Sequence, residues 1–194
     1  MGNRQLLFKI EVRKPLFCHY HYIRDQMIQK EHEHIKNTKH DLQIVLIAEN
    51  IRTPENAGMM MRLAEAYGVE MIFFVGEQAI ELTTKVKRAS RNTYKTMKYE
   101  FVMDAKKQIS QLKDSGYHLL ALEITDRSIP IQKLGLENHK KIMLLVGSER
   151  QGISEELLQL CHHHFHIPMF GENSSINVVN ALAIGLFKLT ENYG

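Results

Sequence analysis

The chain has 194 residues, of which 44% are hydrophobic and 24% charged, and its formal net charge at pH 7 is +3. These values are ordinary for a globular protein of one domain, and the mild charge permits nucleic-acid binding without arguing for it. No apolar run approaches the ~20 residues of a membrane helix, and no signal-peptide core opens the chain. Two cysteines, Cys18 and Cys161, form no disulfide framework, so we expect a cytoplasmic protein.

Residues 1–41 are predicted to form an N-terminal extension. Apolar and charged residues alternate over 8–13, which predicts a half-exposed strand that ends before Pro15. Residues 18–41 are rich in His, Lys, Glu and Gln with apolar residues at loose helical spacing, which predicts an amphipathic helix.

From residue 42 onward, apolar strands alternate with helices. The expected strands are residues 44–48, 71–75, 97–103, 117–122, 142–146 and 164–167. The expected helices are residues 54–67, 79–90, 104–114, 154–161 and 176–190. Near-continuous apolar strands that alternate with helices are typical of an α/β fold with a largely parallel sheet and helices on both faces. We therefore expect a single domain over residues 42–194.

A first polar segment runs from residue 50 to Arg62 between an expected strand and helix. Thr53 and Pro54 read as the N-cap and the first helical residue, and Asn56 follows in the first turn. Gly58 costs about 1 kcal/mol relative to alanine inside a helix, so its small size must be needed. Either it clears a hollow beside Arg62, which shares its helix face, or it marks a close helix–sheet contact.

A second polar segment leaves the expected strand 142–146. Gly147 permits a tight turn or a close approach of a ligand to the backbone. Glu149 has no lysine partner at helical spacing, and Ser154 reads as the N-cap of the next helix. A ligand-binding loop is favoured here over a plain connection.

A third polar segment precedes the closing helix 176–190. We expect its N-cap among residues 173–175, while Ser175 and Asn177 could offer hydrogen-bonding groups to a ligand. The small residues of this helix, Ala181 and Gly185, predict close packing against another helix or another subunit.

The sequence also contains a cluster of basic residues and a cluster of histidines, and it lacks several common motifs. Positive charge gathers in residues 85–98, which reads either as a solvated helix face or as a nucleic-acid contact. The histidines at 162–164 and 166 lack finger-like spacing and matching cysteines, so no metal site is expected. No dinucleotide-binding glycine motif, phosphate-binding loop or nucleophile elbow occurs in the sequence.

The three polar segments, in this order, resemble the signature motifs of the SpoU (TrmH-type) branch of the SPOUT RNA methyltransferases. They read Asn-Ile-Arg-Thr-Pro-Glu-Asn-Ala-Gly continuing to Arg62, Leu-Val-Gly-Ser-Glu-Arg-Gln-Gly-Ile, and Ile-Pro-Met-Phe-Gly continuing to Ser-Ile-Asn-Val. The resemblance covers about residues 43–190. It implies a C-terminal trefoil knot, S-adenosyl-L-methionine as cofactor, and a homodimer whose active site lies at the subunit boundary. The implied reaction methylates a ribose 2′-OH of tRNA or rRNA.

The resemblance also implies roles for individual residues. The implied catalytic positions are Asn56, Arg62, Glu149, Ser175 and Asn177. The implied cofactor-binding positions are Leu122, Glu123, Gly147, Ile167, Ser175 and Ile176. For RNA contact, the basic residues that we expect first are Lys85, Lys87, Arg88 and Arg91. Arg91 and Asn92 stand where relatives often have glycine.

Arg62 is the usual candidate for activating the hydroxyl, but arginine is effectively always protonated. A charged Arg62 could instead fix a phosphate and stabilise the forming alkoxide, while another group or water takes the proton. Two rival functions stay open: a catalytically silent RNA-binding protein of the same fold, and a small-molecule methyltransferase. The sequence does not specify the target RNA.

Overall fold

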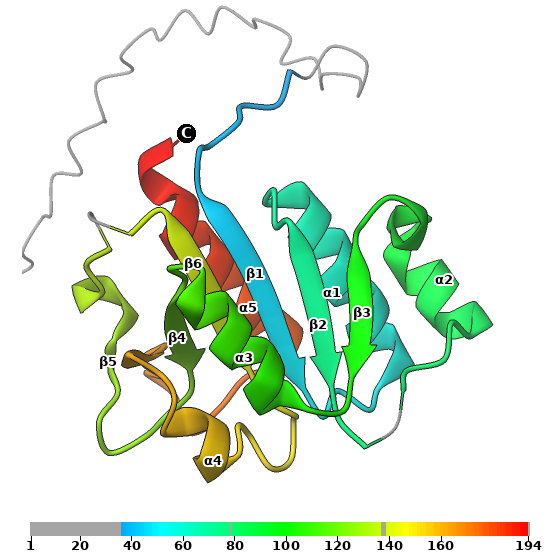
Figure 1. Ribbon diagram of the computed structural model, residues 1–194. Helices are drawn as coiled ribbons and strands as arrows, with labels where there is room; N and C mark the ends of the chain where they lie inside the picture. Colours follow the sequence, from blue (N-terminus) through cyan, green and yellow to red (C-terminus); the bar gives the residue numbers. More distant parts are fainter. Residues whose placement is uncertain (1–35, 78, 137–138, 194) are drawn as a thin grey trace, which may run out of the picture. The chain divides into compact units, whose positions relative to one another are not determined.

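The computed structural model describes residues 36–77, 79–136 and 139–193 (Figure 1). Residues 36–41, at the end of the helix predicted over 18–41, are not helical. The rest of that helix and the strand predicted over 8–13 lie outside the described residues. No helix in the described part of the chain combines the length and apolar character that crossing a membrane requires.

A seven-stranded sheet with the order β3-β2-β1-β6-β4-β7-β5 forms the centre of the fold. Its strands are β1 (Gln43–Glu49), β2 (Met71–Val75), β3 (Tyr99–Val102), β4 (His118–Leu122), β5 (Ile129–Pro130), β6 (Lys141–Val146) and β7 (His163–His166). Every pairing between these strands is parallel. The predicted parallel α/β architecture is therefore confirmed, and only the two-residue edge strand β5 was not predicted.

The described residues form five α-helices, four between strands and the last after β7. They are α1 (Pro54–Ala66), α2 (Thr84–Ser90), α3 (Ala105–Asp114), α4 (Glu155–Leu158) and α5 (Val178–Thr190). The helix predicted over 79–90 is wrong in its first five residues, because Thr83 caps α2 by accepting a hydrogen bond from Val86 N–H at 3.4 Å. The helix predicted over 154–161 is also too long, since α4 ends at Leu158.

Helices cover both faces of the sheet (Figure 1). Alternate residues of β1 show the division: Leu46 packs with α1 and α5, whereas Ile47 packs with α3 and α4. Each face therefore has its own buried core, and the strands between them are apolar on both sides, as parallel sheets require.

Gly58 marks a close contact between two helices, so the reading of a hollow beside Arg62 is wrong. A β-carbon on Gly58 would lie 2.6 Å from the carbonyl oxygen of Val86 and 2.8 Å from the β-carbon of Ala89, both on α2. The alternative of a helix–sheet contact is also incorrect, since the partner is α2. The glycine lets α2, with its basic side chains, lie directly against α1.

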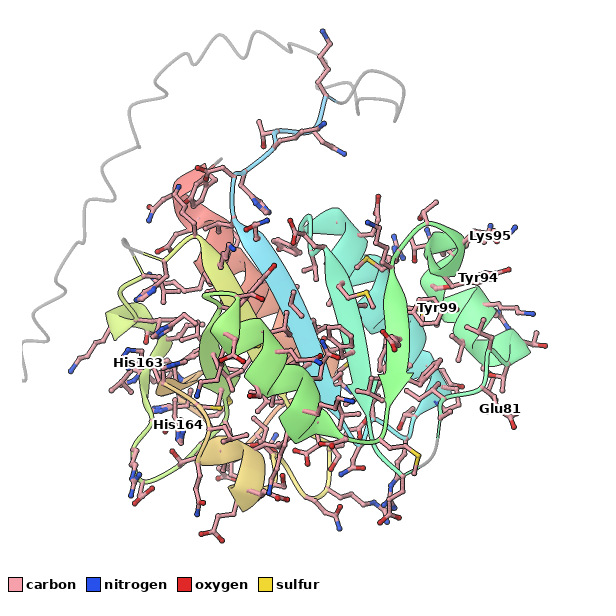
Figure 2. The ribbon with its side chains drawn as sticks, in the orientation of Figure 1. Glu81, Tyr94, Lys95, Tyr99, His163 and His164 are labelled. Atoms are coloured by element: carbon pink, nitrogen blue, oxygen red, sulfur yellow. The ribbon has the colours of Figure 1, made fainter. Side chains whose placement is uncertain are left out.

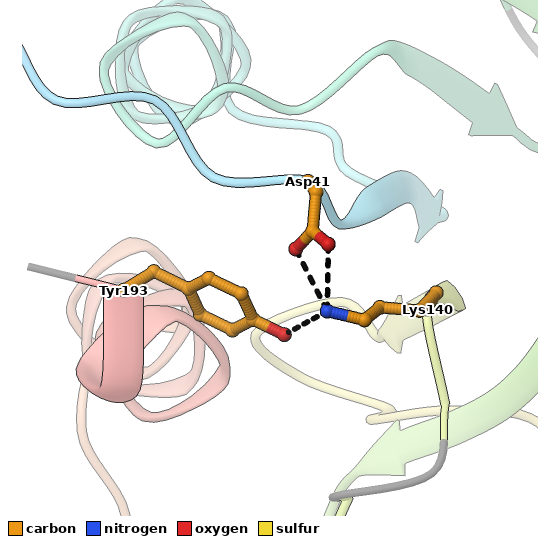
Figure 3. A network of polar contacts seen from close by, with 3 residues as sticks. All are labelled: Asp41, Lys140 and Tyr193. Atoms are coloured by element: carbon orange, nitrogen blue, oxygen red, sulfur yellow. Dashed lines mark hydrogen bonds and ion pairs between the residues drawn. The ribbon is translucent and has the colours of Figure 1, made fainter.

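A polar network joins three segments: the one before β1, the one before β6 and the C-terminal turn after α5 (Figure 3). Lys140 donates to both carboxylate oxygens of Asp41 at 2.8 Å and to the Tyr193 hydroxyl at 3.0 Å. The hydrogen bond from Lys140 lowers the pKa of Asp41, and the same pairing raises the pKa of Lys140. All three groups are solvent-accessible, so the network contributes little to the free energy of unfolding.

The histidine run lies at the amino end of β7, where His163 and His164 are strand residues (Figure 2). The His118 ring stacks between His139 and His162, with centroids at 3.9 and 4.3 Å. Burial, and then the neighbouring imidazoles, lower the pKa of His118 to about 4. This stack lies at the opposite end of β4 from the predicted cofactor residues Leu122 and Glu123.

Candidate active site

A hollow of about 190 Å³ opens at the carboxyl ends of β4, β6 and β7. All six residues predicted to bind the cofactor line it: Leu122, Glu123, Gly147, Ile167, Ser175 and Ile176. They come from three separate loops, so the fold brings together what the sequence spreads over more than fifty residues. We call this space the cofactor hollow, and ligands of parallel sheets bind at this kind of edge.

The loop after β6 forms a tight wall of the cofactor hollow. Ser148 and Gly152 exchange two backbone hydrogen bonds, at 3.1 and 3.0 Å, and Ser148 Oγ accepts a third from Gln151 N–H at 3.1 Å. A β-carbon on Gly147 would collide with the backbone of Gly152 and Ile153. Gly147 is therefore required by the turn itself, which is the first of the two roles that the sequence left open.

Two carboxylates hold the far end of this loop. Glu123, after β4, accepts from Ile153 N–H at 3.1 Å, and Glu49, at the end of β1, accepts from Ser154 N–H at 2.8 Å. Ser154 occupies the N-cap position of α4 as predicted, but its side chain makes no capping hydrogen bond. The loop is thus fixed by neighbouring strands, and the second Glu123 oxygen accepts from Ile124 N–H at 2.9 Å.

Three of the five predicted catalytic residues form one hydrogen-bonded chain. The Asn56 amide, which is only 4% exposed, donates to Glu149 Oε1 and accepts from the Asn177 amide at 3.4 Å. Asn177 Oδ1 in turn accepts from Val179 N–H at 2.8 Å. The starts of α1 and α5 and the loop after β6 are therefore linked through side chains that the sequence placed in three different motifs.

Asn177 is also the N-cap of α5, so the N-cap predicted among residues 173–175 is wrong. Ser175 is free of that structural role and lines the cofactor hollow with an exposed side chain. The prediction failed because Asn177 serves two neighbours at once, and residue type alone does not separate a capping asparagine from a ligand-binding one.

Arg62 lies apart from the other predicted catalytic residues. Its side chain is exposed on α1, one turn beyond Gly58, and it lines no hollow described here. Thr53, at the N-cap of the same helix, makes no side-chain capping bond, whereas Pro54 is its first residue as predicted. Within one chain, the structure thus joins Asn56, Glu149 and Asn177 but leaves Arg62 outside.

The basic residues predicted to contact RNA are exposed on and beside α2. Lys85 pairs with Glu55 on α1 at 3.4 Å, and Tyr94 and Lys95 continue this surface towards β3 (Figure 2). Arg91 and Asn92 adopt left-handed backbone angles, with φ of 47° and 73°. The loop therefore keeps the conformation that glycine favours at this place, although both residues carry side chains.

A second hollow, of about 900 Å³, was not predicted from the sequence. It lies at the carboxyl ends of β1, β2 and β3, and the loop after β6 separates it from the cofactor hollow, since Gln151 lines one and Gly152 the other. Its lining includes Glu49, Glu77 and Glu81, so we call it the acidic hollow (Figure 2 labels Glu81). The available signal was positional: acidic residues follow three neighbouring strands.

The described residues contain no group of three or more His, Cys, Asp or Glu side chains arranged to hold a metal ion. Burial raises the pKa of the Cys161 thiol to about 12. This thiol is therefore not a nucleophile near neutral pH.

Solved structures share the class of fold that the sheet and its loops define, a parallel α/β fold. An AdoMet-bound rRNA methyltransferase from Sinorhizobium meliloti matches 77% of this chain and 56% of its own, with a TM-score of 0.72 and 23% identity. An RNA 2′-O ribose methyltransferase matches 84% and 61%, with a TM-score of 0.69 and 21% identity. At this identity the matches establish the fold alone.

The profile of the SpoU rRNA methylase family matches residues 43–187, and the chain belongs to this family. A Staphylococcus aureus protein of the TrmH family of tRNA/rRNA methyltransferases is 27% identical over 165 residues, which are 85% of this chain. The chain spans 63% of the length of that relative. The predicted family membership is therefore confirmed.

Proposed function

We propose that the protein is an S-adenosyl-L-methionine-dependent methyltransferase that methylates a ribose 2′-OH of tRNA or rRNA. The observation that carries the proposal is that the cofactor hollow and the hydrogen-bonded chain of catalytic candidates share one residue, Glu149. Leu122, Gly147 and Ile176 line the cofactor hollow, and Glu149, which also lines it, receives a hydrogen bond from Asn56. A cofactor site and a polar chain suited to positioning a reacting hydroxyl thus share one wall. The family match and the names of the relatives support this reading.

The residues of the hollow fit the proposed cofactor. Its backbone wall at Gly147 excludes any side chain, its apolar lining includes Leu122 and Ile176, and the exposed hydroxyl of Ser175 offers a donor and an acceptor. A mixture of backbone, apolar and few polar groups is typical of cofactor pockets. When bound, the cofactor supplies an electrophilic methyl group.

The protein's own residues would then position and stabilise the ribose oxygen. Asn56 donates to the Glu149 carboxylate at the start of α1, and Asn177 donates to Asn56. A permanently charged Arg62 would bind the phosphate next to the target ribose and stabilise the alkoxide as it forms. The proton would pass to another group or to water.

A homodimer belongs to the proposal because Arg62 lies outside the cofactor hollow of its own chain. Arg62 and the exposed Met59 lie one turn apart on α1, and α5, which contacts α1, exposes Ile184 and Phe187. A second copy on this face would bury these apolar side chains and bring Arg62 to a subunit boundary. A measured mass of one chain in light scattering at micromolar concentration would refute the dimer.

The proposal also includes a trefoil knot in the C-terminal half, a cytoplasmic location, and RNA contact through Lys85, Lys87, Arg88 and Arg91. The exposure of these four side chains on one helix and its adjoining loop supports the RNA contact. Binding through phosphates releases counterions, so RNA affinity should fall steeply as salt rises. An affinity that does not change with salt would favour a small-molecule methyltransferase instead.

The test uses RNA from a strain that lacks the protein. Mapping of 2′-O-methyl groups identifies the missing site, and the purified protein should restore it in the presence of S-adenosyl-L-methionine. Arg62→Ala should abolish methylation and leave cofactor affinity within about twofold, because Arg62 does not line the cofactor hollow. Arg127→Ala, which changes another exposed arginine, is the control. If no methyl group is missing from the strain, the silent RNA-binding alternative gains support.

A further inference from the structure

The acidic hollow has the size and place of a ligand site, yet the proposed function does not use it. Its volume of about 900 Å³ falls within the range of small-molecule pockets. It opens where β1, β2 and β3 end, and parallel sheets bind ligands beyond the carboxyl ends of their strands. Residues 148–152 separate it from the cofactor hollow, so a ligand in it would lie beside the proposed reacting ribose.

Glu49 is a buried carboxylate in this hollow, and, as far as the chain is described, only one of its two oxygens accepts a hydrogen bond. It is 6% exposed, and its Oε2 accepts one hydrogen bond, from Ser154 N–H. Among the described residues, Glu49 forms no ion pair, and its Oε1 accepts no hydrogen bond. Oε1 is not among the described side-chain atoms that are buried without a partner, so it is open to the hollow, where water or a ligand can donate to it. Glu49 lines the hollow, so a ligand that donates an N–H would complete its environment.

The remaining charges favour a donor ligand that is not a phosphate. Of the residues that the structure describes, Glu77, Glu81, Asp104 and Glu156 also line the hollow and outnumber its two cations, Arg52 and Lys106, of which Lys106 pairs with Glu156. Acidic walls repel phosphate groups. The basic surface of α2 begins at Lys85, two residues after Thr83, which lines the hollow, and could hold the phosphates of the same ligand.

Apolar side chains give the hollow surfaces that suit a flat ring. Its lining includes Ile51, Pro54, Phe74, Ile80 and Leu157. Proteins that read single-stranded RNA turn unstacked bases outward, pack them on apolar or aromatic side chains, and hydrogen-bond their edges. The acidic hollow offers both elements, the packing surface and the acceptor.

We propose that the acidic hollow binds an RNA base with an exocyclic amino group, and that Glu49 Oε1 accepts the hydrogen bond from this group. The inference rests on the proposed function, because it makes the base part of the RNA substrate. Carboxylates accept from the cytosine amino group in the same way in nucleic-acid complexes. Cytosine, adenine and guanine carry such a group. Uracil does not, and its single Watson–Crick N–H lies between two carbonyl oxygens that a carboxylate repels.

The test starts with the full-length protein and the four nucleosides, followed by ¹H–¹⁵N NMR. Cytidine or guanosine should shift the amides of Gly76 and Ala79 in the acidic hollow more than those of Gly147 and Ser175 in the cofactor hollow, whereas adenosine, which is part of the proposed cofactor, should shift both sets. Uridine should bind about tenfold more weakly, as expected for one lost base-edge contact. A five-residue oligocytidine should compete with cytidine for the same amides, since the proposed ligand is a base within RNA.

Glu49→Gln is the decisive variant. Its amide oxygen can still accept from Ser154 N–H, while its amino group replaces the free acceptor with a donor. Binding of amino-bearing bases should fall about tenfold, because donor would meet donor, and binding of uridine should rise. Glu100→Gln, an exposed change on β3 outside the hollow, is the control and should leave all four affinities unchanged.

The possible outcomes separate this inference from the proposed function. Equal binding of uridine in the wild-type protein, shifts confined to α2, or failure of oligocytidine to compete would each overturn the inference. Tighter binding of spermidine than of the nucleosides would assign the hollow to a polyamine and would also overturn it. Wild-type nucleoside titrations decide the matter even if Glu49→Gln does not fold. Cofactor binding and methylation, measured on the same sample, report on the proposed function independently.

Discussion

Asn56→Asp tests the hydrogen-bonded chain that joins three of the predicted catalytic residues. The wild-type amide donates to Glu149 Oε1 and is almost fully buried. Aspartate keeps the size and shape of asparagine but replaces this donor with a second carboxylate oxygen. A buried carboxylate would then face the exposed carboxylate of Glu149.

The magnitude of the effect has two parts. Loss of the hydrogen bond costs about 1 kcal/mol, because water can solvate the exposed Glu149 carboxylate. The second part depends on pH, because burial and the neighbouring negative charge raise the pKa of the introduced carboxyl above its unfolded value of about 3.9. The folded variant then holds a proton that the unfolded chain releases, so its stability falls as pH rises above about 4. The slope is at most about 1.4 kcal/mol per pH unit until the raised pKa is passed.

Urea denaturation at pH 5, 6, 7 and 8 measures both parts. Asn56→Ala should show a loss that is nearly independent of pH relative to the wild-type protein, whereas the loss in Asn56→Asp should grow over this range. Asn173→Asp, an exposed change of the same chemistry, should be neutral at every pH. If the aspartate and alanine variants lose the same stability at every pH, Asn56 does not face Glu149 as described.

Three other predictions follow from particular contacts. Gly58→Ala should lower the melting temperature, because the added β-carbon meets backbone atoms of α2. The cost of overpacking, about 1–3 kcal/mol, exceeds the gain in helix propensity of about 1 kcal/mol. The control Gly171→Ala, with open space around it, should leave the melting temperature unchanged. The wild-type protein should lose stability as pH falls from 6.5 towards 4, because the lowered pKa of His118 keeps the folded imidazole neutral while the unfolded chain takes up a proton. In His118→Phe this loss of stability should be smaller, by no more than about 1 kcal/mol after solvent screening. Identical pH profiles of stability in the two proteins would contradict the lowered pKa of His118. Charge reversal at Lys87 and Arg88 should weaken RNA binding at least about tenfold at moderate salt without changing cofactor affinity. Charge reversal at the exposed Lys107 on α3 should not weaken RNA binding. Equal RNA affinities of the two variants would show that α2 does not contact RNA.

The architecture was predictable because strands such as β1 and β6 are apolar throughout and alternate with helices. Helix boundaries were less predictable: α2 begins at Thr84 because a threonine side chain caps it, and several polar residues before it could have served equally. The role of Gly58 was also hidden, since its partner on α2 lies about thirty residues further along the chain.

The candidate site was predictable only as a set of residues. Family resemblance selected the residues that line the cofactor hollow, but no pattern indicated that Asn56 would bond to Glu149 or that Asn177 would cap α5. These contacts depend on how three loops meet in space, and residue spacing within each motif carries no information about that. The acidic hollow was missed for the same reason, because its walls come from four loops.

The loop of residues 148–152 is a partition with a binding space on each side, and it is held at its end by one carboxylate from each side. Glu123 fixes Ile153, and Glu49 fixes the next residue, Ser154. If occupation of either hollow shifts this partition, the two ligands must influence one another reciprocally: a cofactor that raises the affinity for RNA by some factor has its own affinity raised by the same factor. A single turn of backbone would then decide the order in which cofactor and RNA assemble.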